Sequence, residues 1–334
     1  MQQDRLTVGK LRGLQQIANE RGIFTMLALD HRGSLRKALN PMAPAQVPYE
    51  TMVELKVLLA RILGPHASAV LLDPIYGAAQ AVGQGALPGQ VGLIVSLEAS
   101  GYEGEATARR TALIPHWDVS KAKRMGASAV KLLLYYHPAS LTARDQEELT
   151  ATVADACRTA DIAFLLEPLS YALDPAAPKG SQAFARERPH IVHDTARQLV
   201  GLGVDVLKAE FPADLQYESP EQALGQCRRL SEAIDVPWVL LSAAVDYELF
   251  RRQVEIACRG GAAGFLAGRA IWQEITRLGR EQWEEYAATT AVDRLRELVE
   301  IANATGRPYR PTVQIPPDWH EAYASEAALA ALFD

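Results

Sequence analysis

The chain has 334 residues, of which 49% are hydrophobic and 22% are charged, and its formal net charge is −6. This composition is typical of an ordinary globular protein, and the negative charge argues against a nucleic-acid-binding surface. No apolar run reaches the ~18 residues that a transmembrane helix needs, and the polar stretch Met1 to Arg5 does not resemble a signal peptide.

Short apolar runs alternate with amphipathic segments along the chain, and they predict eight strands with helices between them. The runs are apolar throughout, as expected of strands that are covered on both faces. The strands are expected at residues 23–30, 69–73, 92–97, 129–135, 163–167, 206–211, 238–242 and 264–268, and helices at 49–63, 117–125, 145–159, 188–202, 220–233 and 248–259. Glycines that suit left-handed helix ends follow three of these helices.

Eight strand–helix repeats predict a closed parallel (β/α)8 TIM barrel, as a single domain over residues 1–304. A doubly wound open sheet is the alternative, but no Gly-x-Gly-x-x-Gly turn follows the first strand. Residues 305–334 are expected to form an extension, helical at 321–332, that packs on the barrel or on a partner subunit of a homo-oligomer. The segment 77–89 and a long loop at 170–189, a possible lid, also fall outside the repeat.

The three cysteines are far apart in the chain, and each lies in a predicted helix. Cys157, Cys227 and Cys258 are therefore expected to be small buried hydrophobic residues in a reducing compartment, which indicates the cytoplasm. No cluster of cysteine and histidine has the spacing of metal ligands, so no metal site is expected.

A polar or reactive side chain stands at or just beyond the C-terminal end of every predicted strand. In order these are Asp30, Asp73, Glu98, Lys131, Glu167, Lys208 with Glu210, Ser242 and Arg269. The strand ends of a barrel converge on one axis, and barrel enzymes build their active sites there. We therefore expect these side chains, including Asp73 and Glu98, to surround a substrate.

Two of these residues, Lys131 and Lys208, are lysines inside apolar strands. Burial disfavours a charged amine and lowers its pKa, and a neutral amine can attack a ketone to form a Schiff base. We assign Lys208 as the nucleophile and Lys131 as its electrostatic neighbour, although the sequence leaves the reverse order open. A structural ion pair is the alternative for either lysine.

Carboxylates near the lysines are candidates for proton transfer. Glu167 ends an apolar run, and burial would suit it to general acid–base catalysis, whereas a salt bridge to a strand lysine is the alternative. Asp30 is expected to orient a substrate oxygen or to cap the next helix. Glu210 shares a face with Lys208 and is either a catalyst or an ion-pair partner. No cofactor is expected, because the lysine imine itself accepts the electrons.

An anion site is expected where the last two strands end. Barrels often bind phosphate with the loops after strands seven and eight. The small residues Ala243 and Gly268 let backbone N–H groups approach an anion, while Ser242 adds a hydroxyl and Arg269 a guanidinium. His31 is expected either to contact a second anion or to pack at the rim.

Taken together, several segments resemble the class I tagatose-1,6-bisphosphate aldolases and the related sulfofructose-phosphate aldolases. The matching segments are 27–33, 71–77, 130–136, 166–168, 206–212, 241–245 and 268–272. The resemblance implies a Schiff base at Lys208 and acid–base catalysis by Glu167. It also implies substrate contacts from Asp30 and Lys131, and phosphate contacts from Ser242 and Arg269.

The resemblance implies cleavage of a ketose 1-phosphate that bears an anion at C6, giving dihydroxyacetone phosphate and a three-carbon aldehyde. This chain has His31 where the family usually has glutamine, and Ala244 where it usually has glycine. Residues 236–242 and 264–269 are nearer the sulfosugar branch, and 180–185 nearer the tagatose branch, so the ketose stays open. A sulfofructose-phosphate aldolase, a transaldolase and a phosphosugar-sensing regulator are the alternatives.

Overall fold

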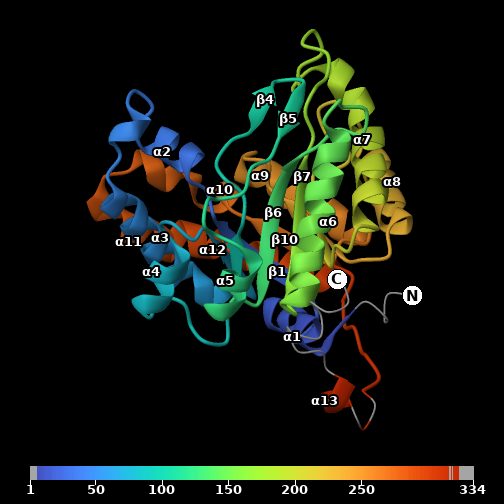
Figure 1. Cartoon of the computed structure of the whole chain (residues 1–334). Coiled ribbons are helices and arrows are strands. Elements are labelled where there is room, and N and C mark those ends of the chain that lie inside the picture. Colours follow the sequence, from blue (N-terminus) through green and yellow to red (C-terminus); the bar gives the residue numbers. More distant parts are fainter. Residues whose placement is uncertain (1–5, 316, 318, 323–334) are drawn as a thin grey trace.

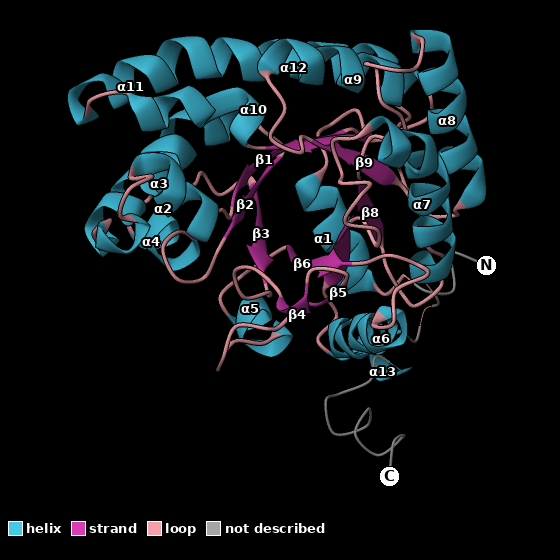
Figure 2. Cartoon of the chain, turned by 90° about the horizontal axis from the view of Figure 1, so that it is seen from above, coloured by secondary structure: helices cyan, strands magenta, loops and turns pink. Residues whose placement is uncertain are grey.

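The computed structural model describes residues 6–315, 317 and 319–322 of the chain. Eight parallel strands close into a barrel in the order β1-β10-β9-β8-β7-β6-β3-β2 (Figure 2). The strands are β1 (Phe24–Leu29), β2 (Ala69–Leu72), β3 (Gly92–Ser96), β6 (Ala129–Tyr135), β7 (Ala163–Leu169), β8 (Val206–Ala209), β9 (Trp238–Leu241) and β10 (Gly264–Ala267). The predicted (β/α)8 barrel is confirmed.

Helices surround this barrel, and several of them bury one face against the strands. In α9, for example, Phe250, Val254 and Ala257 are buried on one face, which is the spacing of an amphipathic helix. The helices around the barrel are α2 (Gly33–Leu39), α3 (Tyr49–Leu63), α4 (Ala78–Gly83), α5 (Val119–Arg124), α6 (Ala143–Thr159), α7 (Gln182–Val200), α8 (Pro220–Ala233), α9 (Tyr247–Arg259), α10 (Arg269–Trp272), α11 (Trp283–Tyr286) and α12 (Val292–Thr305). The three cysteines are free and buried in α6, α8 and α9, as predicted.

The loop after β7 is shorter than the sequence predicts. Helix α7 begins at Gln182, not at residue 188, and the Ser181 side chain caps it by accepting the Phe184 N–H at 3.2 Å. The prediction started this helix at residue 188, so Pro189 stood in its first turn, where proline is tolerated. Here the cap and the buried Phe184 hold an additional N-terminal stretch in place. The helix α4 likewise occupies part of the segment 77–89.

A two-stranded hairpin that the sequence did not predict stands above the barrel. It consists of β4 (Glu103–Glu105) and β5 (Ala108–Arg110) and lies between β3 and β6 in the chain (Figure 1). The Arg109 guanidinium lies 4.4 Å from the centre of the Tyr102 ring and 4.8 Å from that of Tyr171. These cation–π contacts hold the hairpin against the loop after β7.

The opposite end of the barrel is closed by α1 (Val8–Ile17), which lies below the strands in Figure 1 and is seen through the ring of strands in Figure 2. The approach is close, since a Cβ on Gly13 would lie 2.2 Å from the Ser128 carbonyl oxygen. Tail residues cross the same end, with the Arg307 N–H donating to the Ala262 carbonyl and the Tyr309 N–H to that of Gly22.

Beyond this stretch the described tail contains α13 (Trp319–Ala322). The helix predicted at 321–332 lies mostly outside the described residues. Among the described helices, none combines the length and the apolarity that crossing a bilayer requires.

Candidate active site

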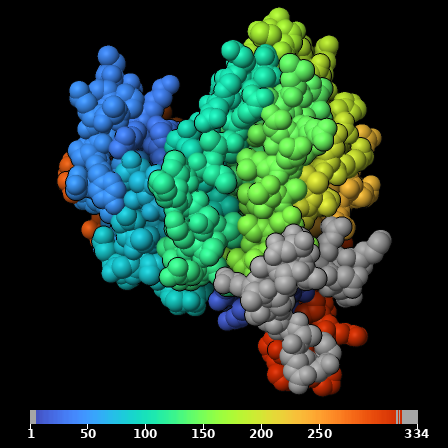
Figure 3. Space-filling model, viewed as in Figure 1, coloured from blue at the N-terminus to red at the C-terminus, as the bar shows by residue number. Residues whose placement is uncertain are grey.

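A pocket of about 530 Å³ opens at the C-terminal end of the barrel. The molecular surface is hollowed there between the blue segment that carries α2 and the teal segment that carries the hairpin (Figure 3). Most of the predicted strand-end residues line it: Asp30, His31, Glu98, Lys131, Glu167, Lys208, Ser242, Ala243, Ala244, Gly268 and Arg269. Seven of the eight strands therefore deliver a polar side chain or backbone to one cavity.

Lys131 on β6 is buried and surrounded by three carboxylates. Its Nζ lies 2.8 Å from oxygens of Asp30, Glu98 and Glu167. Burial alone would lower the pKa of Lys131, but these three carboxylates outweigh it and raise that pKa well above its usual value. The expectation of a lowered pKa is thus wrong for this lysine, because the sequence did not reveal how many carboxylates converge on it. Lys131 is a fixed cation.

Asp30 is the counterpart of this cation. Burial alone would raise the pKa of Asp30, but Lys131, with Lys208 adding to it, lowers that pKa far below its usual range. The Asp30 carboxylate is directed at Lys131 and does not cap α2, whose N-cap is Arg32 without a side-chain bond.

Glu167 joins the two strand lysines. Its Oε1 lies 2.8 Å from Lys208 Nζ, and its Oε2 lies 2.8 Å from Lys131 Nζ. The side chains of Lys208 and Glu167 are only 5% and 9% exposed. The strands explain the contact, because the pairing of Leu166 with Leu207 brings the next residue of each strand side by side. A proton can therefore pass directly between Lys208 and Glu167.

Asp73 is not brought to this pocket, contrary to the prediction. It is fully buried, pairs with Lys56 of α3, and accepts the N–H groups of Ile75 and Tyr76 at 2.9 Å each. Lys56 lies within a helix, and the sequence alone did not reveal it as the partner of Asp73. Asp73 consequently organises the turn after β2.

Glu210 also lies outside the pocket that holds Lys208. Its carboxylate pairs with Lys179 and accepts the N–H of Ser170 at 2.9 Å. Because β8 ends at Ala209, Glu210 no longer follows the strand alternation that would have put it on the face of Lys208. It is the ion-pair partner that the sequence offered as an alternative, and it anchors the loop after β7.

The loops after β9 and β10 form one wall of the pocket. Ala243 and Ala244 have φ angles of 46° and 58°, in the left-handed region that favours glycine. A Cβ on Gly268 would lie 2.6 Å from the Ala28 carbonyl oxygen, so only glycine fits there. Burial lowers the pKa of Arg269, and its Nε has no hydrogen-bond partner among the described residues. This wall presents a guanidinium and exposed backbone to a ligand.

His31 lies beside that wall. Its ring packs edge-on against Trp272 with the ring centres 5.3 Å apart, and Gly268 lies close to its Cε1. Burial, helped by Arg269, outweighs the attraction of Asp30 and lowers the pKa of His31 to about 3. The imidazole is therefore neutral at ordinary pH.

Sequence reasoning missed Arg32, which also lines the pocket. Its guanidinium donates to the Glu98 carbonyl oxygen, and its Nε has no partner in the described part of the chain. Ser34, Ser100 and Gly101 line the pocket near it. Its place directly after Asp30 and His31 was the available signal, because the loop after a barrel strand usually faces the active site.

Comparison with known proteins identifies this arrangement. The family model for DeoC/LacD family aldolases matches residues 24–274, which is most of the barrel. The chain belongs to the DeoC/LacD aldolase family. The family resemblance read from the motifs is thereby confirmed, and the protein is an aldolase, a carbon–carbon lyase.

Curated relatives of this aldolase match over nearly their whole length. Tagatose 1,6-diphosphate aldolase 2 of Streptococcus mutans is 31% identical over 333 residues, covering 93% of this chain and 99% of the relative. Tagatose 1,6-diphosphate aldolase of Lactococcus lactis is 30% identical, covering 91% of this chain and 98% of the relative.

Solved structures agree on the fold of this aldolase. An archaeal fructose 1,6-bisphosphate aldolase matches with a TM-score of 0.57 at 23% identity, covering 88% of this chain and 99% of that one. The fructose-bisphosphate aldolase of Plasmodium falciparum matches with a TM-score of 0.65 at 14% identity, covering 91% and 95%. At these identities the likeness concerns the barrel architecture alone.

Proposed function

We propose that this aldolase works through a Schiff base on Lys208 and cleaves a ketose 1-phosphate with a second anion at C6, of the tagatose 1,6-bisphosphate type. The single observation that carries the proposal is the buried contact of 2.8 Å between Lys208 and Glu167 at the pocket floor. The named substrate of the similar aldolases supports the tagatose type over the sulfosugar alternative.

In the proposed reaction Glu167 takes a proton from Lys208, and the free amine attacks C2 of the ketose. Glu167 returns this proton to the hydroxyl of the resulting carbinolamine, water leaves, and a protonated imine forms while Glu167 is again a carboxylate. Glu167 then accepts the proton of the C4 hydroxyl, the C3–C4 bond breaks, and the imine takes up the electron pair. The three-carbon aldehyde leaves first, Glu167 returns its proton to C3 of the enamine that remains, and hydrolysis of the imine so formed releases dihydroxyacetone phosphate and the Lys208 amine. No cofactor enters this scheme, because the imine is the electron sink.

The fixed charges around the pair have separate roles in this proposal. Lys131 keeps its proton and orients substrate hydroxyls together with Asp30, while Glu98 holds Lys131 in place. The C1 phosphate binds at Ser242, Ala243, Gly268 and Arg269. The second anion binds toward Arg32 and the neutral His31, which line the pocket as well.

Borohydride trapping tests the Schiff base. With dihydroxyacetone phosphate and borohydride, the wild-type chain is expected to gain a covalent adduct that mass spectrometry maps to Lys208. Lys208→Ala is expected to abolish both adduct and activity, whereas Lys179→Ala, at a half-exposed loop lysine, keeps both. An adduct on Lys131 would exchange the two assignments, and full activity of Lys208→Ala would refute the mechanism.

A coupled assay tests the substrate. Tagatose 1,6-bisphosphate, fructose 1,6-bisphosphate and sulfofructose 1-phosphate are compared by kcat/KM, with and without an acceptor aldehyde. The highest value is expected for tagatose 1,6-bisphosphate, and the rate is expected not to depend on the acceptor. Strict dependence on an acceptor would indicate a transaldolase, and absence of turnover would indicate a regulator.

We also propose that the enzyme works in the cytoplasm as a homo-oligomer to which the extension 305–334 contributes contacts. Three buried free cysteines support a reducing compartment. Light scattering of the full chain and of a chain ending at residue 310 tests the assembly. If both form assemblies with the same number of subunits, residues 311–334 have no role in it.

A further inference from the structure

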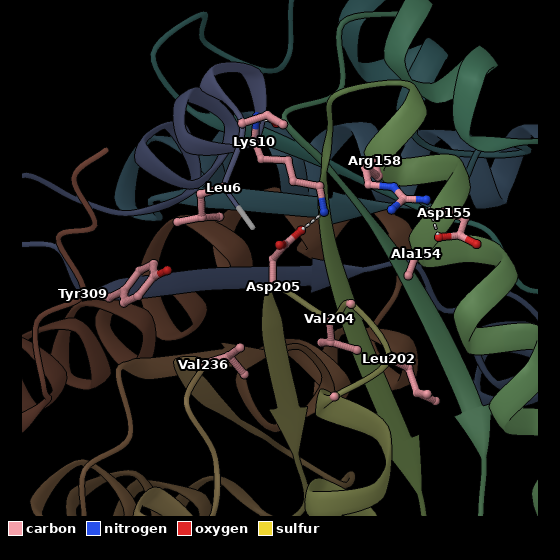
Figure 4. Close-up of a pocket in the computed structure, with 13 residues that line it drawn as sticks. Leu6, Lys10, Ala154, Asp155, Arg158, Leu202, Val204, Asp205, Val236 and Tyr309 are labelled. Atoms are coloured by element: carbon pink, nitrogen blue, oxygen red, sulfur yellow. Dashed lines mark hydrogen bonds and ion pairs between the residues drawn. The ribbon is translucent and has the colours of Figure 1, made fainter. Parts of the chain in front are cut away.

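Two networks of charged residues tie outer helices to the barrel at a distance from the catalytic lysines. Beneath the strands, Lys10 of α1 lies 2.8 Å from Asp205 Oδ2 in a cavity of about 390 Å³ (Figure 4). This pair stands at the end of the barrel that α1 covers, opposite the catalytic pocket. The other network surrounds Arg294 of α12, and it reaches α10, the helix that begins at Arg269.

The helix α10 consists of only four residues, Arg269–Trp272. A single helical turn is not stable by itself, and its last carbonyl groups have no partners within the helix. The direction in which the Arg269 side chain points therefore depends on contacts between α10 and the rest of the fold. On one side these come from Trp272, whose Nε1 donates to the Ala28 carbonyl at 3.2 Å.

Arg294 supplies the contact on the other side of α10. Its Nη1 donates to the Ile271 carbonyl at 3.2 Å and to Glu274 Oε2 at 2.9 Å. The Tyr286 hydroxyl accepts from the same nitrogen at 3.1 Å and donates to the same carboxylate oxygen at 2.9 Å. The guanidinium also lies 4.9 Å from the centre of the Tyr247 ring. Arg294 is thus fixed from several sides while it satisfies a carbonyl at the end of α10.

A π-helical turn at Ala287–Ala291 explains how Arg294 comes to face α10. The helix α11, this turn and α12 follow one another directly, so Tyr286 and Arg294 stand eight residues apart on one helical stretch. In a regular α-helix, positions eight apart point in directions that differ by about 80°. The extra residue of a π turn removes most of that difference and lets the two side chains meet. Such turns are frequent at functional sites.

We propose that Arg294 is a positioning residue, which holds α10 so that the Arg269 guanidinium faces the C1 phosphate of the substrate. The inference rests on the proposed function, in which Arg269 binds that phosphate. The described residues that line the catalytic pocket include Arg269 but not Arg294. Arg294 therefore acts through Arg269, and it affects substrate binding without taking part in the chemistry at Lys208.

Steady-state kinetics of Arg294→Met test this role with the ketose that the coupled assay selects. Methionine keeps an apolar stem beside Tyr247 but donates no hydrogen bond, so KM is expected to rise about tenfold while kcat stays within about twofold of the wild type. Arg294→Lys, which retains a charged donor, is expected to recover part of the loss. If Arg294→Met does not fold, Arg294→Lys carries the same comparison with a smaller rise in KM.

The matched control is Arg251→Gln. In the described part of the chain, Arg251 of α9 pairs with Glu248 at 3.3 Å and with Glu297 of α12 at 3.6 Å, and it has no ion pair with α10. This substitution also removes an arginine that bridges to α12, but KM is expected not to change.

A double-mutant cycle decides whether Arg294 acts through Arg269. Arg269→Gln alone is expected to raise KM, and adding Arg294→Met is expected to change KM by less than about twofold further. The inference is overturned if Arg294→Met keeps the KM of the wild type, if it lowers kcat instead, or if the two effects multiply in the double variant. An unchanged KM in Arg269→Gln would refute the phosphate contact of the proposed function, and this inference with it. Borohydride trapping of Lys208 reports on the Schiff base separately.

Discussion

Two buried lysine–carboxylate pairs, Lys56–Asp73 and Lys208–Glu167, differ in how completely the protein satisfies them. Lys56 also donates to the Leu29 carbonyl at 2.8 Å, and Asp73 accepts two backbone N–H groups. Lys208 has Glu167 alone as its ion-pair partner in the described part of the chain, and this pair faces a pocket. A pair that further protein groups hold on both sides stabilises the fold, whereas a pair that opens on a cavity is available for chemistry.

Neutralising Glu167 in the pair Lys208–Glu167, which opens on the pocket, gives the largest expected effect, a loss of activity. Glu167→Gln keeps the shape of the side chain but cannot move a proton, so kcat is expected to fall by about 10²–10⁴-fold. The coupled assay measures kcat, and circular dichroism checks that the fold persists. Glu210→Gln, at a buried glutamate outside the pocket, is the matched control and is expected to stay active. Equal losses in the two variants would remove the distinction between them.

Neutralising Asp73 in the enclosed pair Lys56–Asp73 should lower the stability of the fold and leave activity unchanged. Asp73→Asn leaves the buried Lys56 without its counter-charge, so the free energy of unfolding is expected to drop by about 3–5 kcal/mol. Urea denaturation measures the drop, and kcat of the folded fraction is expected not to change. At the half-exposed pair Arg110–Asp145, Asp145→Asn is expected to cost less than about 1 kcal/mol. A loss of kcat in Asp73→Asn would place Asp73 in the catalytic machinery.

The sequence alone could not predict which of these two lysine–carboxylate pairs is enclosed and which opens on the pocket. The apolar runs predicted all eight barrel strands, and the polar residues after them predicted most of the pocket, because strand ends in a barrel must converge. Asp73 also stands after a strand, but its side chain pairs with Lys56 and not with the pocket residues. This pairing depends on how α3 packs, which the sequence did not show. Local sequence also could not show the three carboxylates around Lys131, since they come from three separate strands.

The hairpin and the start of α7 escaped prediction for a different reason. The short strands β4 and β5 are mostly exposed and lack apolar alternation, so no periodicity marks them. The long loop predicted at 170–189 in fact ends at Ser181, whose side chain caps the start of α7. In the sequence, nothing distinguishes Arg32 from an arginine on the surface. Its role becomes visible only in the structure, where its guanidinium donates to the Glu98 carbonyl oxygen.

A smaller effect is expected in the pH dependence of stability, which tests the environment of His31 in the catalytic pocket. The pKa of His31 is lowered from 6.5 to about 3 in the folded chain. At pH 5 the unfolded state therefore binds more protons, and stability falls as the pH drops below 6.5. This group alone is expected to cost about 2 kcal/mol between pH 7.5 and pH 5. His31→Gln should remove that part of the slope in urea denaturation, and an unchanged slope would contradict the burial of a neutral imidazole.

The smallest expected effect is a gain in stability at Ala244, in the pocket wall that the loops after β9 and β10 form. Ala244 has a φ of 58°, which strains a residue that bears a Cβ. Ala244→Gly is expected to raise the free energy of unfolding by about 0.5–1 kcal/mol. Ala176→Gly, at an exposed loop position outside the residues with positive φ, should instead lower it by about 0.4–1 kcal/mol. Thermal unfolding separates the two signs, and a loss in both variants would show that the backbone at Ala244 is unstrained.

The catalytic pocket opens at the C-terminal end of the barrel, whereas α1 covers the other end in the described part of the chain. In the proposed mechanism the free aldehyde departs while the other fragment is still bonded to Lys208, so the two products pass the same opening of this pocket one after the other.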